Sequence, residues 1–328
     1  MSDNDDYKLF EVRRIVMTTK VTPSMRLKVN RDTFFIPDAN RGMYFRNNSS
    51  SFRMEGSTII QWVEKLIPMF NGQHSLKELT DGLPDLYKNR VLEIANVLLQ
   101  NGFVRDISQD HSHQLPEDTL IKFASQIEFL DHFGGSGAYR FQLFQQSKVL
   151  IIGSGRMINS LVYSLIETGL RDINILYTKA KQSNRLEELL NHINKTDTQV
   201  NYKELILDSE EEAAFRNKIL PFESIFYIAE EVDINELRLL HKLCRKENKL
   251  FIPAIFINRY GLAGPIVTPE PEGCWESAWH SIHKTAIEKK QPISKSTSIA
   301  LLANVIVFEW FKETTGVSDG TNNNRFYL

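Results

Sequence analysis

Residues 149–158 read VLIIGSGRMI, and this stretch decides the fold. Its apolar run suits a buried strand, the turn that follows contains Gly153 and Gly155, and a helical pattern begins directly afterwards. In a nucleotide-binding βαβ unit, the first glycine of such a turn permits the tight bend and the second lets the backbone approach a phosphate. We therefore expect an α/β fold whose first strand ends in a phosphate-loop-like turn.

Two residues depart from a working nucleotide loop. The third small position of the pattern, where the helix packs closely on its strand, is occupied by Ile158. The next apolar strand, 173–177, ends in Tyr177 instead of the acidic residue that would hold ribose hydroxyls. We predict that the turn is a structural remnant and that the chain carries no cofactor.

After this turn, strand-like and helical patterns alternate, which indicates a mostly parallel sheet covered by helices on both faces. The expected strands are 148–152, 173–177, 201–207, 224–229 and 250–257. The expected helices are 158–168, 184–193, 233–246 and a buried terminal helix at 298–312. The sequence thus predicts a doubly wound, Rossmann-like domain.

The N-terminal part has a different pattern. Short β-prone segments between residues 26 and 54 are joined by turn residues, and helical patterns follow at 59–70, 75–81 and 84–100. The second helix opens with Ser75 and has Glu78 three residues later, which predicts a capping box. We expect a winged-helix-like unit, a β-meander followed by three helices.

The polar stretch 106–116 predicts a domain boundary. The expected divisions are a flexible tail at 1–23, the winged-helix-like domain at 24–108, a linker with helices at 109–145 and the α/β domain at 146–328. Because 325–328 reads as the start of a strand, we expect the last domain to be truncated at its C-terminal end.

Composition narrows the functional classes. Of 328 residues, 42% are hydrophobic and 24% charged, with a net charge of -2, so no overall field attracts nucleic acid or an anionic membrane. Cys244 and Cys274 are too few for a disulfide framework or a four-cysteine zinc site. No apolar run approaches the ~18 to 20 residues of a membrane span. The charges of helix 84–100 are mixed rather than basic, which also disfavours DNA binding. We expect a cytoplasmic protein without a nucleic-acid or membrane partner.

Segments 148–155 and 167–176 resemble the first strand, helix and second strand of the ThiF-like (ubiquitin-activating-enzyme-like) adenylating enzymes. Segments 190–202 and 223–230 are similar to that family's following helix with its third strand, and to its fourth strand. The resemblance implies the ThiF type of Rossmann-like sheet.

The same resemblance assigns a remnant of the nucleotide site. It implies that Gly153 and Gly155 form the nucleotide loop, and Glu230 stands where the family has an aspartate near magnesium and triphosphate. Arg185 is the weak counterpart of the family's arginine, and the paired zinc cysteines are absent. The family's catalytic machinery is therefore expected to be degenerate.

The N-terminal unit, about 25–108, resembles the PqqD-like recognition element found on enzymes that modify ribosomally made peptides. Joined to a degenerate ThiF-like domain, it is similar to bacteriocin maturation factors and to the partner (F) proteins of azoline-forming cyclodehydratases. This resemblance implies a pseudoenzyme that binds a precursor's leader peptide and delivers it to a YcaO-type cyclodehydratase, which forms thiazoles and oxazoles. A homodimer is left open.

Such recognition works by strand addition, in which an extended peptide pairs with an exposed sheet edge. Here the edge is expected at 50–54 and the wall of the groove at helix 84–100. The candidate peptide-binding residues are Phe52, Arg53, Tyr87, Arg90, Val91 and Ile94. The two arginines could meet leader carboxylates, whereas Val91 and Ile94 also suit ordinary core positions.

Two enzymatic alternatives remain. An adenylating enzyme would activate a peptide carboxylate with ATP and magnesium through Gly153, Gly155, Arg185 and Glu230. A nicotinamide-dependent oxidoreductase is disfavoured by Tyr177 and by the lack of a convincing proton donor near the strand ends.

Overall fold

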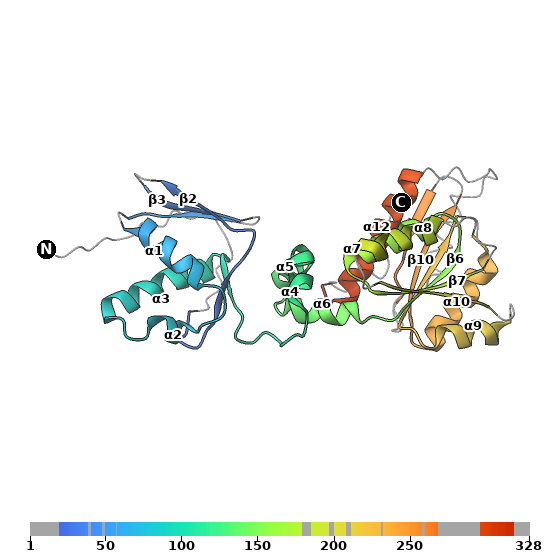
Figure 1. The fold of residues 1–328 in the computed structure, drawn as a ribbon, viewed down its shortest axis with the longest axis horizontal. Coiled ribbons are helices and arrows are strands. Elements are labelled where there is room, and N and C mark those ends of the chain that lie inside the picture. Colours follow the sequence, from blue (N-terminus) through green and yellow to red (C-terminus); the bar gives the residue numbers. More distant parts are fainter. Residues whose placement is uncertain are drawn as a thin grey trace. The chain divides into compact units, whose positions relative to one another are not determined.

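The computed structural model describes residues 20–38, 41–47, 50–56, 58–178, 185–196, 200–207, 211–230, 232–257, 260–267 and 296–317. The chain divides into two compact units, residues 1–112 and 113–328, and each is described by itself (Figure 1).

The first unit contains a meander and a set of helices. Its elements are β1 (Leu27–Val29), β2 (Phe34–Asp38), β3 (Gly42–Arg46), β4 (Ser51–Met54), α1 (Ile59–Leu66), the 3-10 helix η1 (Ile67–Met69), α2 (Leu76–Thr80), α3 (Asp85–Gln100) and β5 (Val104–Asp106). Strands β2, β3 and β4 pair antiparallel in that order, as the sequence predicts. Strand β1 lies outside this meander and pairs with β5, across a long sequence separation that local pattern does not reveal.

The core of this unit lies between the meander and the helices. A row of rings crosses the inner face of the sheet, with Phe35 and Phe45 at 5.5 Å between centroids and Phe45 stacked on Phe52 at 4.7 Å. Helix α3 contributes its buried side, including Leu98. The predicted capping box is confirmed, because the Glu78 backbone N–H donates to the Ser75 hydroxyl and the Ser75 N–H donates to the Glu78 carboxylate.

The second unit is an α/β domain. Its elements are α4 (Glu117–Lys122), α5 (Ala124–His132), α6 (Gly137–Gln145), β6 (Val149–Ser154), α7 (Met157–Thr168), β7 (Asp172–Tyr177), α8 (Arg185–Thr196), β8 (Asn201–Leu205), α9 (Glu212–Ile219), β9 (Ser224–Ala229), α10 (Ile234–Lys246), β10 (Leu250–Ile257), β11 (Tyr260–Ala263) and α12 (Ser296–Thr314). The strand order is β11-β10-β9-β6-β7-β8, and every pairing is parallel except that of β10 with β11. The expected α/β fold with a doubly wound, mostly parallel sheet is confirmed.

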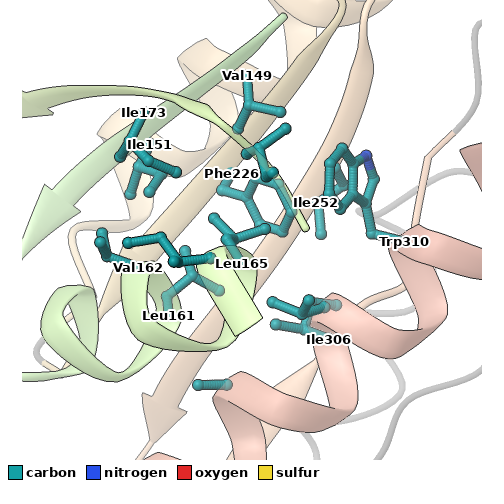
Figure 2. Packing of buried hydrophobic residues seen from close by; sticks show 14 of the residues in the cluster. Val149, Ile151, Leu161, Val162, Leu165, Ile173, Phe226, Ile252, Ile306 and Trp310 are labelled. Atoms are coloured by element: carbon teal, nitrogen blue, oxygen red, sulfur yellow. The ribbon is translucent and has the colours of Figure 1, made fainter. Parts of the chain in front are cut away.

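Alternate side chains of the central strands point to opposite faces of the sheet. On one face, Val149 and Ile151 of β6 pack with Leu161 and Leu165 of α7 and with Ile306 of α12 (Figure 2). On the other face, the intervening residues of the same strands pack on α9 and α10. Burial on both faces explains why the strands read as continuous apolar runs.

Helices α4 to α6 lie in the stretch that the sequence treats as linker with helices. Phe123, Phe141 and Phe144 are almost fully buried in the same cluster as β6 and α12. Helices α4 to α6 therefore contribute to the core of the second unit.

Candidate functional site

The glycine turn lies at the carboxyl end of β6, where the strand order of the sheet reverses direction, the usual ligand position in such folds. Gly153 and Gly155 have φ values of 148° and 95°, which side-chain-bearing residues rarely adopt. A Cβ atom on Gly153 would overlap the carbonyl oxygen of Ile228 on the neighbouring strand β9. Both glycines are thus required by the backbone itself, with or without a ligand.

Glu230, directly after β9, fills the space in front of this turn. Its carboxylate accepts hydrogen bonds from the backbone N–H groups of Arg156 and Met157, the second at 3.1 Å. The Arg156 guanidinium also donates to this carboxylate, from Nη2 at 3.0 Å and from Nε at 3.3 Å. The Glu230 side chain is only 16% exposed. The chain's own carboxylate therefore binds the N-terminus of α7, where a phosphate would otherwise bind.

This internal carboxylate changes what the turn can accept. An added Cβ at Gly155 would lie 2.7 Å from Glu230 Oε1, which shows how closely the side chain covers the loop. A phosphate would have to displace the carboxylate and break its pairing with Arg156, because two anions cannot share the same donors without strong repulsion. The arrangement can bind a nucleotide only after Glu230 moves.

The neighbouring strand end is aromatic. Tyr177, half-buried, closes β7 beside Gly153, and Tyr202 of β8 donates to the Glu204 carboxylate. Burial, followed by this hydrogen bond and the nearby Tyr177, raises the pKa of Tyr202 well above its usual range. The position where a ribose-binding acid is expected, the end of β7, carries the side chain of Tyr177 instead. Ile158 is buried in the core.

The structure brings together three of the four predicted loop residues, Gly153, Gly155 and Glu230. Arg185 is exposed at the first position of α8. Sequence reasoning missed Arg156, which pairs with Glu230. The available signal was an arginine beside the glycine turn and an acid ending an adjacent parallel strand.

Metal ligation has little support in the described residues, which contain no cluster of three or more His, Cys, Asp or Glu side chains suited to a metal ion. Cys274 lies outside the described residues. Cys244 is buried in the core, and burial raises the pKa of its thiol, so it is not placed as a nucleophile.

The second candidate site is the free edge of β4. The N–H of Asn47 donates to the Ser50 carbonyl at 2.9 Å, which closes the β3–β4 hairpin. In an antiparallel pair the bonded positions alternate, so Phe52 and Met54 bond to β3 while the N–H and C=O groups of Ser51 and Arg53 face away from it. Within the described ranges no other strand pairs with this edge.

The opposite edge of the meander is less suitable for pairing. By the same alternation, Phe35 and Pro37 carry the outward-facing backbone positions of β2. Pro37 has no N–H, and proline on an edge strand blocks the addition of another strand. Strand β4 is therefore the edge that retains regular donors and acceptors.

The six predicted peptide-binding residues divide into two groups. Phe52, Val91 and Ile94 are 5%, 2% and 3% exposed and belong to the core of the first unit. In this conformation they pack beneath the sheet and do not line an open groove. The other three lie on or near the surface. Arg53 lies 3.9 Å from Asp38, Arg90 lies 3.5 Å from Glu93, and Tyr87 is half-exposed beside Trp62.

Together these features define the class of fold: a ThiF-type α/β domain with an additional N-terminal meander-and-helix unit. Solved structures of this fold include E. coli MccB with ATP (TM-score 0.60, 16% identity, 92% of this chain and 93% of that chain). The microcin C7 biosynthetic enzyme MccB in complex with N-formylated MccA matches equally well (TM-score 0.60, 15% identity, 92% of each chain). A heterocyclase in complex with substrate and cofactor matches more weakly (TM-score 0.52, 12% identity, 93% of this chain and 35% of that chain).

At these identities the likeness establishes the fold. No protein-family model and no curated protein matches the chain. None of the described helices is both long and apolar enough to cross a membrane.

Proposed function

We propose that this chain binds the leader of a ribosomally made precursor peptide and delivers it to a separate YcaO-type cyclodehydratase that forms thiazoles or oxazoles in the cytoplasm. In this proposal the first unit holds the peptide and the ThiF-type unit is a docking platform that does not adenylate. The observation that carries the proposal is the pairing of an open β4 edge with a glycine turn filled by Glu230.

The β4 edge supports peptide binding by strand addition. The outward N–H and C=O groups of Ser51 and Arg53 repeat every second residue, which is the spacing that an added strand requires. Asn47 and Ser50 tie the β3–β4 hairpin to the end of α3 through Asn47 Nδ2 to Gly102 O at 3.1 Å and Ser50 Oγ to Asn101 O at 3.1 Å. The hairpin end of the edge is therefore anchored to the residues after α3, which lowers the ordering cost of binding.

The filled turn supports a role without ATP chemistry. Glu230 accepts from the backbone amides of Arg156 and Met157 at the start of α7, and the Arg156 guanidinium pairs with it. Tyr177 stands at the ribose position. Both features weigh against a triphosphate at this end of the sheet.

The comparisons support a peptide as partner. MccB is solved in complex with N-formylated MccA, and the heterocyclase is solved with substrate. The part of that heterocyclase similar to this chain is 35% of its length, which is consistent with a division of labour in which a separate protein supplies the ring-forming chemistry.

The test is a binding measurement with fluorescein-labelled N-terminal segments of the small peptides encoded beside this gene. We expect micromolar or tighter binding, at least about ten-fold weaker in Arg53→Pro than in Arg53→Ala, because only the proline removes an outward N–H. Calorimetry with magnesium-ATP should give no heat. ATP binding without peptide binding would overturn the proposal.

An adenylating enzyme remains the second candidate, because the glycine turn keeps its backbone form and Glu230 keeps a carboxylate near it. MccB with ATP has the same fold. In this case Glu230 would swing away from α7 on binding ATP and magnesium. Exchange of labelled pyrophosphate into ATP, dependent on added peptide and lost in Glu230→Ala, would favour this candidate.

A further inference from the structure

The solvent-facing side of the meander carries two arginines close to the proposed binding edge. Along β4 the side chains alternate, so Phe52 and Met54 point to the core while Ser51 and Arg53 lie on the outer face. Arg46 of β3 lies opposite Ser51 on that outer face and is exposed. The outer face next to β4 is therefore positively charged.

Strand addition converts this pattern into a sequence preference. The peptide residue that pairs with Arg53 has its side chain on the outer face, roughly 5 Å from Arg53 between Cβ atoms. The residue two positions away pairs with Ser51, whose short side chain leaves Arg46 uncovered. The backbone of the peptide residue that pairs with Ser51 lies two strand spacings, about 10 Å, from the backbone of Arg46. An extended arginine side chain and an extended glutamate side chain together span this distance.

The residue between these two points inward. It extends the row formed by Phe35, Phe45 and Phe52, which is apolar across all three strands. A polar side chain at this level would lose hydration beside the Phe52 ring, which offers it no hydrogen bond.

We propose that the edge selects an extended peptide with an acidic–apolar–acidic core, in which Arg53 and Arg46 bind the two carboxylates and the row ending at Phe52 receives the apolar residue. This inference rests on strand addition at β4. Asp38 lies 3.9 Å from Arg53 and competes with the peptide carboxylate for the guanidinium.

The test uses three synthetic peptides that carry fluorescein on the N-terminus, Ser-Glu-Val-Glu-Val-Glu-Ser-amide and its counterparts with lysine or glutamine in place of glutamate. Their affinities for the full chain should rank glutamate above glutamine above lysine. Arg53→Glu and Arg46→Glu should each weaken the glutamate peptide about ten-fold and strengthen the lysine peptide, since exposed ion pairs of this kind contribute up to about five-fold and reversal adds repulsion. Asp38→Asn should tighten the glutamate peptide about two-fold.

Arg41→Glu is the matched control, because this exposed arginine lies in the β2–β3 turn, outside the paired residues of β3 and β4, and should leave the ranking unchanged. Equal binding of all three peptides, lost in Arg53→Pro, would overturn the charge preference and leave strand addition intact. Binding of the glutamate peptide that survives Arg53→Pro would overturn strand addition itself.

Discussion

Two sets of backbone donors distinguish the two units of this protein. At the N-terminus of α7, the amides of Arg156 and Met157 are satisfied by Glu230 of the same chain. At the edge of β4, the outward amides of Ser51 and Arg53 have no strand partner within the described residues. The helix terminus is filled by a carboxylate of the same chain, whereas no described strand covers the β4 edge. The proposed peptide site therefore lies where backbone donors lack a strand partner, and not at the glycine turn typical of the fold.

The largest expected effect concerns the closed site, by which we mean the glycine turn filled by Glu230, and tests how closely Gly153 packs on β9. Gly153→Ala places a Cβ against the Ile228 carbonyl at a φ that favours glycine, so we expect a loss of about 3 kcal/mol or more in unfolding free energy. Urea denaturation followed by circular dichroism measures it. Gly82→Ala is the control for positive φ alone, because no atom lies within 4 Å of an added Cβ there. Equal losses at the two glycines would mean that strain, without the close packing on β9, accounts for the effect.

The open edge can be tested from the side of the ligand. Methylating the peptide amides that face β4 should weaken binding by at least about ten-fold, because each methyl removes a hydrogen bond and blocks close approach. Methylating the alternate amides, which face solvent, should have little effect. Fluorescence anisotropy with the two methylated forms gives the comparison, and a loss independent of methyl position would contradict strand addition.

Opening the closed site should have an intermediate effect. Glu230→Ala removes the carboxylate that binds the α7 amides and should destabilise the second unit by about 1 kcal/mol. It should also create weak phosphate binding that the unaltered chain lacks, detected by phosphorus NMR titration. Glu230→Gln should lose less unfolding free energy than Glu230→Ala, because its uncharged amide oxygen can still accept from the backbone amides of Arg156 and Met157. Phosphate binding by the unaltered chain at equal strength would show that Glu230 does not close the turn.

The smallest effect concerns α2, where the Glu78 carboxylate accepts a hydrogen bond from the backbone amide of the N-cap residue Ser75. The Ser75 backbone N–H, and then its side chain, lower the pKa of Glu78 below its usual value near 4.5. The stabilisation is therefore present above that value and is lost as pH falls through the lower pKa of the folded state. Amide exchange of α2 should accelerate in Glu78→Gln at neutral pH, with the difference vanishing in acid. Glu64→Gln, an exposed position in α1, is the control.

Much of the fold could be predicted from local pattern. The apolar runs and glycine turn around Gly153 predict the first βαβ unit, and the expected helix at 158–168 differs from α7 by one residue at its start. The Ser75 and Glu78 spacing predicts the capping box. Helix ends and strand starts depend on neighbours within a few residues, so local sequence is sufficient for them.

The candidate sites depended on longer contacts. The sequence placed Phe52, Val91 and Ile94 in a peptide groove, but only packing distinguishes a groove wall from a core, and the structure buries all three. The pairing of Arg156 with Glu230 joins residues 74 positions apart. No local pattern specifies which distant side chain fills a turn.

The sequence by itself determined the class of fold, the separation into two parts and the presence of Tyr177, rather than an acid, at the end of β7, because these depend on residue type and short spacing. Only the tertiary structure decided that Glu230 fills the glycine turn and that β4, rather than β2, presents an open edge. Glu230 reaches the turn because β6 and β9 pair side by side. The open edge of β4 follows from the alternation of hydrogen bonds across the meander, and Pro37 blocks the edge of β2. Both features are set by strand pairing, which joins residues far apart in the sequence.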